Sequence, residues 1–363
     1  MAAAGIPATG TSTTGTSTTG TSTTGTSTTG GEQPQVIAVV VTYNRRDLLT
    51  EALSAVLGQS RAPDAVIVID NASTDGTAEM VTTRFPSARL ATARRNTGGA
   101  GGFAYGLALA LAEAADLVWL MDDDTVPEPG ALRAMLDARA LHPGAPPALI
   151  ASRVVWTDGR PHPMNTPRIK PLVSKEERLA AAAAGCLPIR SASFVSILVD
   201  ADLCRARGLP QADYFLWNDD FEFTARLLRG RAGLLCPASV VVHKTATFGS
   251  TNADPGERFF YEVRNKVWML RAGSSLAPAE RVLYGGATLR RWARTFAKSS
   301  DRGTLRSGLF AGLAAGVRTG PRPTGEVLAS AGLIVPSDQG SSGQEPGDQA
   351  PVQAPAGPGS PPG

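Results

Sequence analysis

The feature that most constrains this chain is an acidic triplet, Asp122-Asp123-Asp124, which directly follows the apolar stretch 117–121. The stretch has the length and composition of a buried strand. Carboxylates crowded at the end of such a strand repel one another, and burying them costs several kcal/mol unless a cation or strong donors compensate. A divalent metal with oxygen ligands is the usual compensation, whereas a solvated acidic turn is the alternative that needs no ligand.

Strands and helices alternate over the first half of the chain. Apolar, β-branched runs predict strands at 36–42, 65–69, 89–93 and 117–121. Apolar periodicity predicts helices after Asp47, which is expected to act as a cap, after residue 77, and from the glycine run 98–102 to about 115. Repeated βα units predict an α/β fold with a mostly parallel sheet, in which ligands bind beyond the carboxyl ends of the strands.

Polar residues with no packing role follow each predicted strand. They are Tyr43 and Asn44 after the first, Asp70 and Asn71 after the second, Asn96 after the third, and Asp122, Asp123 and Asp124 after the fourth. Because the carboxyl ends of parallel strands meet at one edge of a sheet, the sequence predicts a single site there.

One interpretation of this edge is a dinucleotide site. Gly99-x-Gly101-x-x-Ala104 formally matches the dinucleotide fingerprint, and acidic residues follow about 20 positions later. However, these glycines come after the third predicted strand instead of the first, and a ribose contact needs one carboxylate where this chain has three. The pattern therefore fits a nicotinamide or flavin enzyme poorly.

The second interpretation is a nucleotide-sugar site, because the motifs resemble those of family 2 inverting glycosyltransferases with the GT-A fold. The matching segments are 40–45, 70–77, 96–99 and the acidic triplet. Within that family, 98–106 and Trp217-Asn218-Asp219-Asp220-Phe221-Glu222-Phe223 look most like the actinobacterial galactofuranosyltransferases, in particular those that begin galactan on lipid-linked rhamnosyl-GlcNAc. The resemblance spans about 36–300. Rhamnosyltransferases that use dTDP-rhamnose share most of these motifs and remain an alternative.

The resemblance implies a role for each residue of the predicted edge. Contacts with the nucleotide sugar are implied for Thr42, Tyr43, Asn44, Asp70, Asn71, Asn96, Gly98, Gly99, Asp122 and Asp123. Asp70 can accept a hydrogen bond from the uracil imide, with a turn-capping Asp as the alternative. The glycine run would let the nucleotide approach the backbone at a helix N-terminus, which favours an anion.

The resemblance also implies a divalent metal, Mn²⁺ or Mg²⁺, held by Asp122, Asp124 and His243. The other histidines, His142 and His162, lie among prolines and are expected in loops.

Catalysis by inversion needs a base that takes the proton from the attacking sugar hydroxyl. Asp220 stands at the position of the family's catalytic base, and Asp219 and Glu222 are supporting candidates. These carboxylates also precede a predicted helix, so capping is the structural alternative.

Composition divides the chain into four parts. Residues 1–34, with four copies of Thr-Ser-Thr-Thr-Gly, and 320–363, rich in Pro, Gly, Ser and Gln, are expected to be disordered because they cannot bury enough surface. Between them, 35–255 is the predicted GT-A domain and 256–319 a basic helical region. The three cysteines have no ligand-like spacing and fit a reducing cytosol.

The basic region points to a membrane surface. Between Glu257 and Arg318 there are twelve Lys or Arg and four Asp or Glu, a net charge of +8 on a chain whose total is +3, which leaves −5 for the remainder. Apolar Leu289, Trp292, Ala293 and Phe296 recur at helical spacing, and Arg290, Arg291, Arg294 and Lys298 occupy the remaining positions. The pattern predicts either a helix on an anionic membrane or a helix packed on the catalytic domain.

These observations set the expected partners. They are UDP-galactofuranose, a polyprenyl-diphosphate-linked glycan acceptor and the membrane surface, which places the protein as a peripheral protein on the cytoplasmic face. A non-catalytic basic protein that binds nucleotides or nucleic acid is the alternative of another class, but only the basic charge favours it, so no nucleic-acid partner is expected. A homo-oligomer is left open.

Overall fold

The computed structural model describes residues 33–248 and 254–336, and the elements below belong to one compact unit that begins at Pro34. The N-terminal repeats lie outside the described residues, so disorder over 1–34 stays a prediction.

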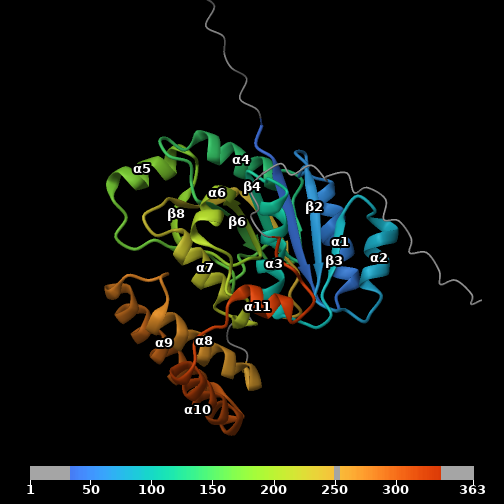
Figure 1. Ribbon diagram of the computed structural model, residues 1–363. Coiled ribbons are helices and arrows are strands. Elements are labelled where there is room, and N and C mark those ends of the chain that lie inside the picture. The colour runs from blue at the N-terminus through green and yellow to red at the C-terminus, as the bar shows by residue number, and fades with distance from the viewer. Residues whose placement is uncertain (1–32, 249–253, 337–363) are drawn as a thin grey trace, which may run out of the picture. The chain divides into compact units, whose positions relative to one another are not determined.

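Four parallel strands form the first half of the sheet, in the order β3-β2-β1-β4 (Figure 1). They are β1 (Val36–Thr42), β2 (Ala65–Asp70), β3 (Arg89–Thr92) and β4 (Leu117–Asp122). Every residue of β1 is buried, as expected for a central strand covered on both faces. The predicted α/β fold is confirmed, and the carboxyl ends of these strands meet at one edge.

Helices cover both faces of this half. They are α1 (Arg46–Leu57), α2 (Thr77–Arg84) and α4 (Ala131–Leu141), which share one apolar cluster with β1, and α3 (Gly98–Ala112), which shares the other. The expectation for Asp47 was wrong. Helix α1 begins at Arg46, and Asp47 lies in its first turn with its side chain exposed.

The second half of the sheet is mixed. Beyond β4 the order continues β9-β6-β10-β8-β7, and β5 pairs with β10, which gives ten strands within the described residues. The bounds are β5 (Thr125–Pro127), β6 (Leu149–Val155), β7 (Arg168–Ile169), β8 (Leu187–Ser191), β9 (Ser196–Asp200) and β10 (Gly233–His243). The pairing of β5 with β10 sets Thr125 opposite His243. It thereby brings the last residue of β10 to the acidic turn after β4.

Short helices link these strands. They are α5 (Lys175–Ala183), α6 (Ala201–Arg207), the 3₁₀ turn η1 (Ala212–Tyr214) and α7 (Asp219–Leu227).

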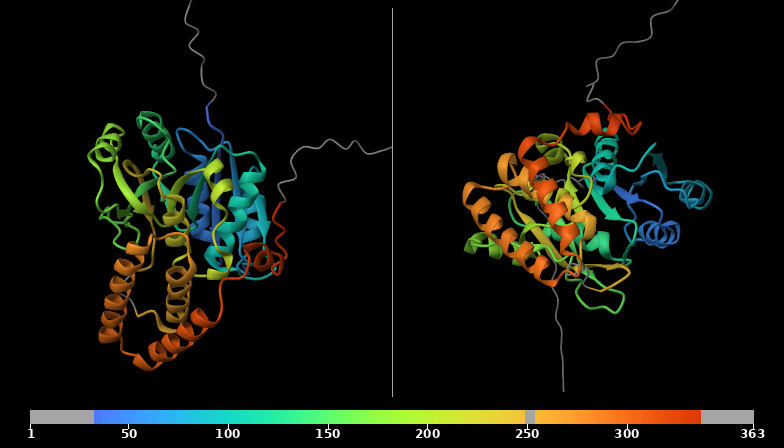
Figure 2. Two further views of the ribbon diagram at one scale, coloured as in Figure 1. Left: turned by 60° about the vertical axis from the view of Figure 1, so that its left-hand side comes forward. Right: turned by 90° about the horizontal axis from the view of Figure 1, so that it is seen from below.

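The basic region forms three helices after the short turn η3 (Gly256–Arg258): α8 (Phe259–Ala272), α9 (Pro278–Lys298) and α10 (Arg302–Arg318). Figure 2 shows them side by side next to the sheet. Trp292 and Phe296 of α9 pack on Phe259 of α8, so part of the apolar stripe predicted for a membrane faces the protein instead. No helix among the described residues is long and apolar enough to span a membrane.

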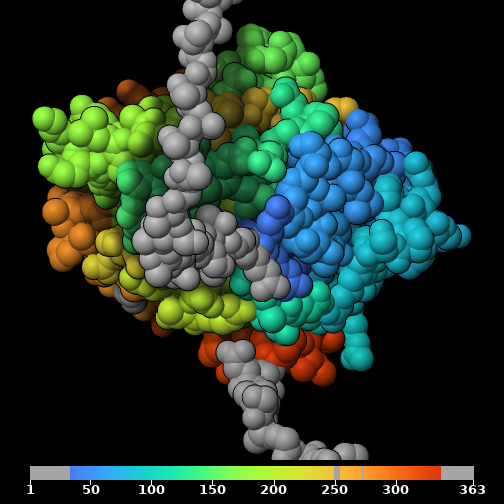
Figure 3. Space-filling model, turned by 90° about the horizontal axis from the view of Figure 1, so that it is seen from above, coloured from blue at the N-terminus to red at the C-terminus, as the bar shows by residue number. Residues whose placement is uncertain are grey.

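The predicted C-terminal tail was wrong over its first part. Residues 320–336 include helix α11 (Thr324–Ala329), and Val327, Leu328 and Leu333 are buried in one cluster with Ala93, which follows β3, and Ala104 of α3. In Figure 3 this red segment lies against the cyan part of the chain. Pro- and Gly-rich composition concealed a few apolar residues with enough burial to order the segment. Residues 337–363 lie outside the described residues.

Candidate active site

Asp123 ties the end of β1 to the acidic turn after β4. Its Oδ2 accepts a hydrogen bond of 2.8 Å from the Thr42 hydroxyl and one of 3.3 Å from the Tyr43 N–H. Its Oδ1 accepts from the Arg45 guanidinium at 3.1 Å. Asp123 is buried, and these donors occupy both its oxygens, so it organises the turn rather than presenting a free carboxylate to a ligand.

Arg45 is a site residue that sequence reasoning missed. The same guanidinium nitrogen that bonds Asp123 also lies 2.5 Å from Asp124 Oδ2. It neutralises part of the acidic triplet with a permanent cation. Its place directly after Thr42-Tyr43-Asn44 was the only signal in the sequence.

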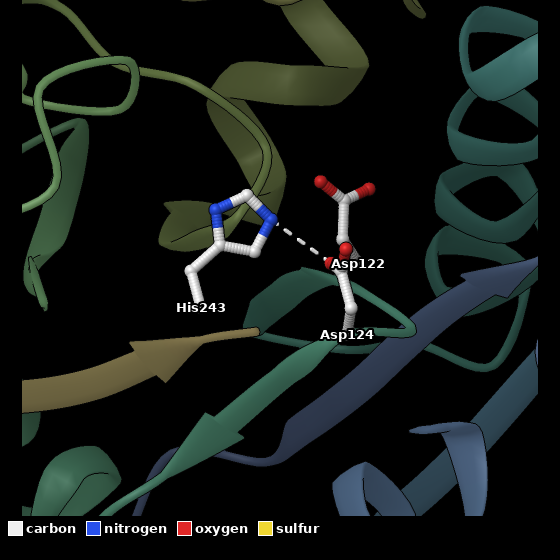
Figure 4. A group of neighbouring side chains, drawn as sticks. All are labelled: Asp122, Asp124 and His243. Atoms are coloured by element: carbon white, nitrogen blue, oxygen red, sulfur yellow. Dashed lines mark ion pairs between the residues drawn. The ribbon is translucent and has the colours of Figure 1, made fainter. Parts of the chain in front are cut away.

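Asp122, Asp124 and His243 form a cluster that can hold a metal ion (Figure 4). One ligand atom from each residue lies within 4.8 Å of the others. Asp124 Oδ1 is buried and lies 2.9 Å from His243 Nε2, so it is paired with the imidazole. A buried carboxylate oxygen beside an imidazole nitrogen and a second carboxylate is a donor set that fits Mn²⁺ or Mg²⁺.

Asn165 orients the histidine of this cluster. Its Oδ1 lies 2.9 Å from His243 Nδ1, which fixes the ring and directs Nε2 toward the carboxylates. His162 lies in a loop, as expected, but it is buried, with its ring centroid 5.0 Å from that of His243. Neither contact has a local sequence signal, because both join segments about 80 residues apart.

The crowded carboxylates shift one another's pKa values, as expected for an acidic triplet at a buried strand end. Burial and the neighbouring Asp124 raise the pKa of Asp122 to about 7. Burial alone would raise the pKa of Asp124, but His243 and Arg45 outweigh it and hold that pKa below its usual value. Burial and the charge of Asp220 raise the pKa of Asp219 well above its ordinary value, and Asp122 adds to the rise. The site thus contains more negative charge than its own cations offset, which favours a bound cation.

The residues after β2 build a cavity wall and a turn. Asp70 is fully buried; its Oδ1 accepts from the Ser73 N–H, while its Oδ2 has no partner within the described residues. This free oxygen fits the predicted contact with a base. Asn71, by contrast, accepts from Thr97 Oγ1 at 2.7 Å and donates to the Gly98 carbonyl, so its amide holds the start of α3.

Two further residues that were predicted to contact the nucleotide accept hydrogen bonds from the backbone of neighbouring turns. The Asn44 side chain accepts from the Thr74 N–H at 2.7 Å, and Asn96 accepts from the Gly98 N–H at 2.7 Å. Tyr43 is 45% exposed at the same edge. The structure therefore brings the predicted residues together, but several of them shape turns.

The glycine run forms the first turns of α3, as predicted for a helix that begins at residue 98. Gly98 has φ +71°, and a Cβ there would lie 1.9 Å from the Phe215 carbonyl oxygen. A Cβ at Gly102 would strike Val41 at 2.4 Å. Gly99 alone of these three has open space at its Cβ position, so it is the glycine that a ligand can approach.

The segment before α7 has a strained backbone. Phe215, Trp217 and Asn218 have φ between 62° and 67°, a region that non-glycine residues seldom occupy. Asn265 of α8 holds this segment, because its amide nitrogen lies 2.8–3.0 Å from three backbone carbonyls, those of Tyr214, Leu216 and Trp217. No local pattern predicts this contact, which joins segments about 50 residues apart.

Asp219 and Asp220 begin α7 and face different surroundings. Asp219 is buried near Asp122. Asp220 is half-buried and lines a pocket of about 310 Å³. Burial raises the pKa of Asp220, while a 2.6 Å hydrogen bond from the Phe221 N–H and the charges of Lys266 and Arg168 oppose the rise.

Two neighbours of Asp220 differ from expectation. Glu222, a supporting candidate for catalysis, is buried in a two-point ion pair with Arg226 of the same helix and is structural. Asn218, which had no expected role, donates to Glu262 of α8 at 2.8 Å and lines the pocket.

Comparison with known proteins agrees with this geometry. The chain matches the family model for glycosyl transferase family 2 over residues 37–189. It is 32% identical over 285 residues to galactofuranosyltransferase GlfT1 of Mycolicibacterium smegmatis, a match that covers 71% of this chain and 94% of the relative. It is 34% identical over 255 residues to GlfT1 of Mycobacterium tuberculosis H37Rv, a match that covers 65% of this chain and 82% of the relative.

Solved structures show the same fold. The crystal structure of S. aureus TarS 1–349 aligns with a TM-score of 0.53 at 18% identity and covers 83% of each chain. The same protein in complex with UDP-GlcNAc aligns with a TM-score of 0.52 at 17% identity, covering 83% of this chain and 84% of that one.

The fold and the family match thus define a glycosyltransferase of the GT-A type. The chain belongs to glycosyl transferase family 2 and is a glycosyltransferase.

Asp124→Ala should weaken Mn²⁺ binding in the presence of UDP and lower nucleotide-sugar turnover by at least about 100-fold, because it removes the buried ligand oxygen. Electron paramagnetic resonance of free Mn²⁺ and a UDP-release assay measure the two effects. Asp202→Ala is the matched control, since Asp202 on α6 has a side chain that is 94% exposed. Unchanged Mn²⁺ binding in Asp124→Ala would contradict the metal site.

Proposed function

We propose that this enzyme moves galactofuranose from UDP-galactofuranose to a polyprenyl-diphosphate-linked rhamnosyl-GlcNAc with inversion, in the synthesis of cell-wall galactan. One observation carries the proposal. The pocket that Asp220 lines is also lined by Asn165, the residue that orients His243 of the metal cluster. Asn165 thus links the cavity that holds the proposed base to the cluster proposed to bind the diphosphate, as transfer between two sugars requires.

The donor side supports a uridine diphosphate. Asp70 offers a buried, unpartnered oxygen to the base, and Gly99 leaves the start of α3 open to an anion. The similarity to the two galactofuranosyltransferases extends beyond the family motifs, because the alignments cover 94% and 82% of those proteins. A shared donor is part of this proposal.

The metal would be held by Asp122, Asp124 and His243, and Mn²⁺ or Mg²⁺ suits their oxygen and imidazole donors. When bound, the ion supplies positive charge that stabilises the departing diphosphate. Arg45 keeps Asp124 ionised and in place for this role. Asp123 fixes the turn through Thr42 and Tyr43.

Asp220 would act as the base. As the acceptor hydroxyl oxygen bonds to the anomeric carbon, the bond between that carbon and the diphosphate oxygen breaks and UDP leaves. The hydroxyl proton passes to the Asp220 carboxylate. Lys266 and Arg168 favour the ionised form that this step needs.

The helices α9 and α10 offer a surface for the membrane that carries a lipid-linked acceptor. Val282, Leu283 and Leu289 of α9 are 76%, 71% and 65% exposed, and Phe310 of α10 is 69% exposed. Arg290, Arg294 and Lys298 are exposed on α9, whereas Arg291 pairs with Glu262 and lines the pocket. Exposed apolar residues beside cations fit peripheral binding at an anionic cytoplasmic membrane face.

Asp220→Asn should abolish galactofuranose transfer to a synthetic rhamnosyl-GlcNAc acceptor and leave UDP binding within about two-fold, because the base acts on the acceptor. Transfer is measured by mass spectrometry and UDP affinity by calorimetry. Asp213→Asn is the control, since Asp213 pairs with Arg322 outside the pocket. A loss of UDP affinity as large as the loss of transfer would place Asp220 in the donor site.

Changing Arg290, Arg294 and Lys298 together to Gln should weaken flotation with anionic liposomes, because each basic residue near such a surface contributes about 1 kcal/mol. The difference should shrink in high salt. The control changes three exposed cations elsewhere, Arg153, Lys175 and Arg178, and thus alters net charge equally. Equal flotation of the two triple variants would contradict a membrane surface on α9.

A further inference from the structure

Two cations line the pocket of Asp220 without an ionic partner. Lys266 of α8 is 4% exposed, with its ammonium 4.7 Å from the centroid of the Phe221 ring. The guanidinium carbon of Arg168 on β7 lies 5.2 Å from the same centroid. Neither forms an ion pair within 33–248 or 254–336, and the intervening residues 249–253 contain no Asp or Glu.

This arrangement is costly for the protein alone. A lysine is seldom buried without a paired charge, because removal from water disfavours the charged form. Burial accordingly lowers the pKa of Lys266 to about 8. The Phe221 ring attracts each cation but has no net charge, so it cannot cancel the repulsion between the two.

The other charges of the pocket do not remove the excess. Glu262 accepts hydrogen bonds from Asn218, Arg291 and Trp292, so the charges of Glu262 and Arg291 offset each other. Glu262 and Asp220 both act on Lys266, and Asp220 also faces Arg168, so with Glu262 offset by Arg291 one carboxylate stands against two cations. One positive charge remains uncompensated beside the proposed base.

We propose that Lys266 and Arg168 form an anion subsite that binds a phosphate of the acceptor while its sugar hydroxyl faces Asp220. This inference rests on the proposed function and names the part of the acceptor that the pocket recognises. The donor diphosphate is the other source of the same chemistry, but the metal cluster is placed to bind it. Lys266 also belongs to the helical region that presents exposed apolar residues on α9, the side from which a lipid-linked acceptor would enter.

The test compares two soluble acceptors with the same disaccharide, one a short-chain alkyl phosphodiester and the other a neutral alkyl glycoside. Wild-type enzyme should prefer the phosphate acceptor in kcat/KM by at least about 10-fold, as expected for a charge-assisted contact. Lys266→Met and Arg168→Gln should each reduce this preference several-fold, mainly through KM. Lys175→Met, an exposed lysine on α5, is the control and should keep the preference.

Calorimetry with UDP and Mn²⁺ separates the two sources of the anion. UDP affinity in Lys266→Met should stay near the wild-type value, which also shows that the variant is folded. If UDP affinity falls as much as the preference for the phosphate acceptor, the two cations bind the donor diphosphate and the proposal is overturned. If Lys266→Met does not fold, the acceptor preference of Arg168→Gln tests the proposal instead, because Arg168 is exposed and its substitution leaves no buried cavity.

Binding of geranyl diphosphate in EDTA separates this inference from the proposed function. Wild-type enzyme should bind it, and Lys266→Met should bind it at least about 10-fold more weakly. If no galactofuranose is transferred but this binding still depends on Lys266, the proposed function fails and the subsite stands. If transfer proceeds and neither the binding nor the acceptor preference depends on Lys266 or Arg168, the subsite alone is wrong.

Discussion

The hydrogen bonds that Asp123 accepts from Thr42, Tyr43 and Arg45 are the interaction on which the site depends. They fasten the turn after β4 to the end of β1 and consume one of three crowded carboxylates. Asp122 and Asp124 remain beside Asp123, and β5 pairs with β10 to bring His243 to these two carboxylates. The excess negative charge of the triplet, which would otherwise destabilise the fold, therefore favours a bound cation at this position.

The acceptor side depends on a second constraint, the strained segment 215–218. Its carbonyls are held by Asn265, and the Phe215 carbonyl lies where a Cβ at Gly98 would be. Helix α8 therefore fixes both the entry to α7, which presents Asp220, and the start of α3 on the donor side. The same helix supplies Lys266 to the pocket, so one element joins nucleotide, base and acceptor. Strain of this kind is maintained where function requires a defined geometry.

The sequence predicted what depends on local pattern. Continuous apolar runs revealed β1, β2 and β4, and the polar residues that follow them meet at one edge, as expected for parallel strands. Contacts between distant segments left no such pattern, so Arg45, Asn165 and Lys266 were missed. Helix α11 was missed because composition averaged over 320–363 concealed Leu328 and its neighbours. The glycines that begin α3 were predicted to admit a nucleotide, whereas packing on Val41 and Phe215 is what requires Gly102 and Gly98.

The central claim is that a single base, Asp220, acts on the acceptor from across the pocket, with no covalent sugar–enzyme intermediate. The anomeric configuration of the product tests this most directly. It is measured by nuclear magnetic resonance of the acceptor disaccharide after transfer of the first galactofuranose from UDP-galactofuranose. The donor sugar is α-linked to its diphosphate, so direct attack by the acceptor predicts a β-galactofuranoside. An α-linked product would contradict a single displacement and, with it, the role given to Asp220.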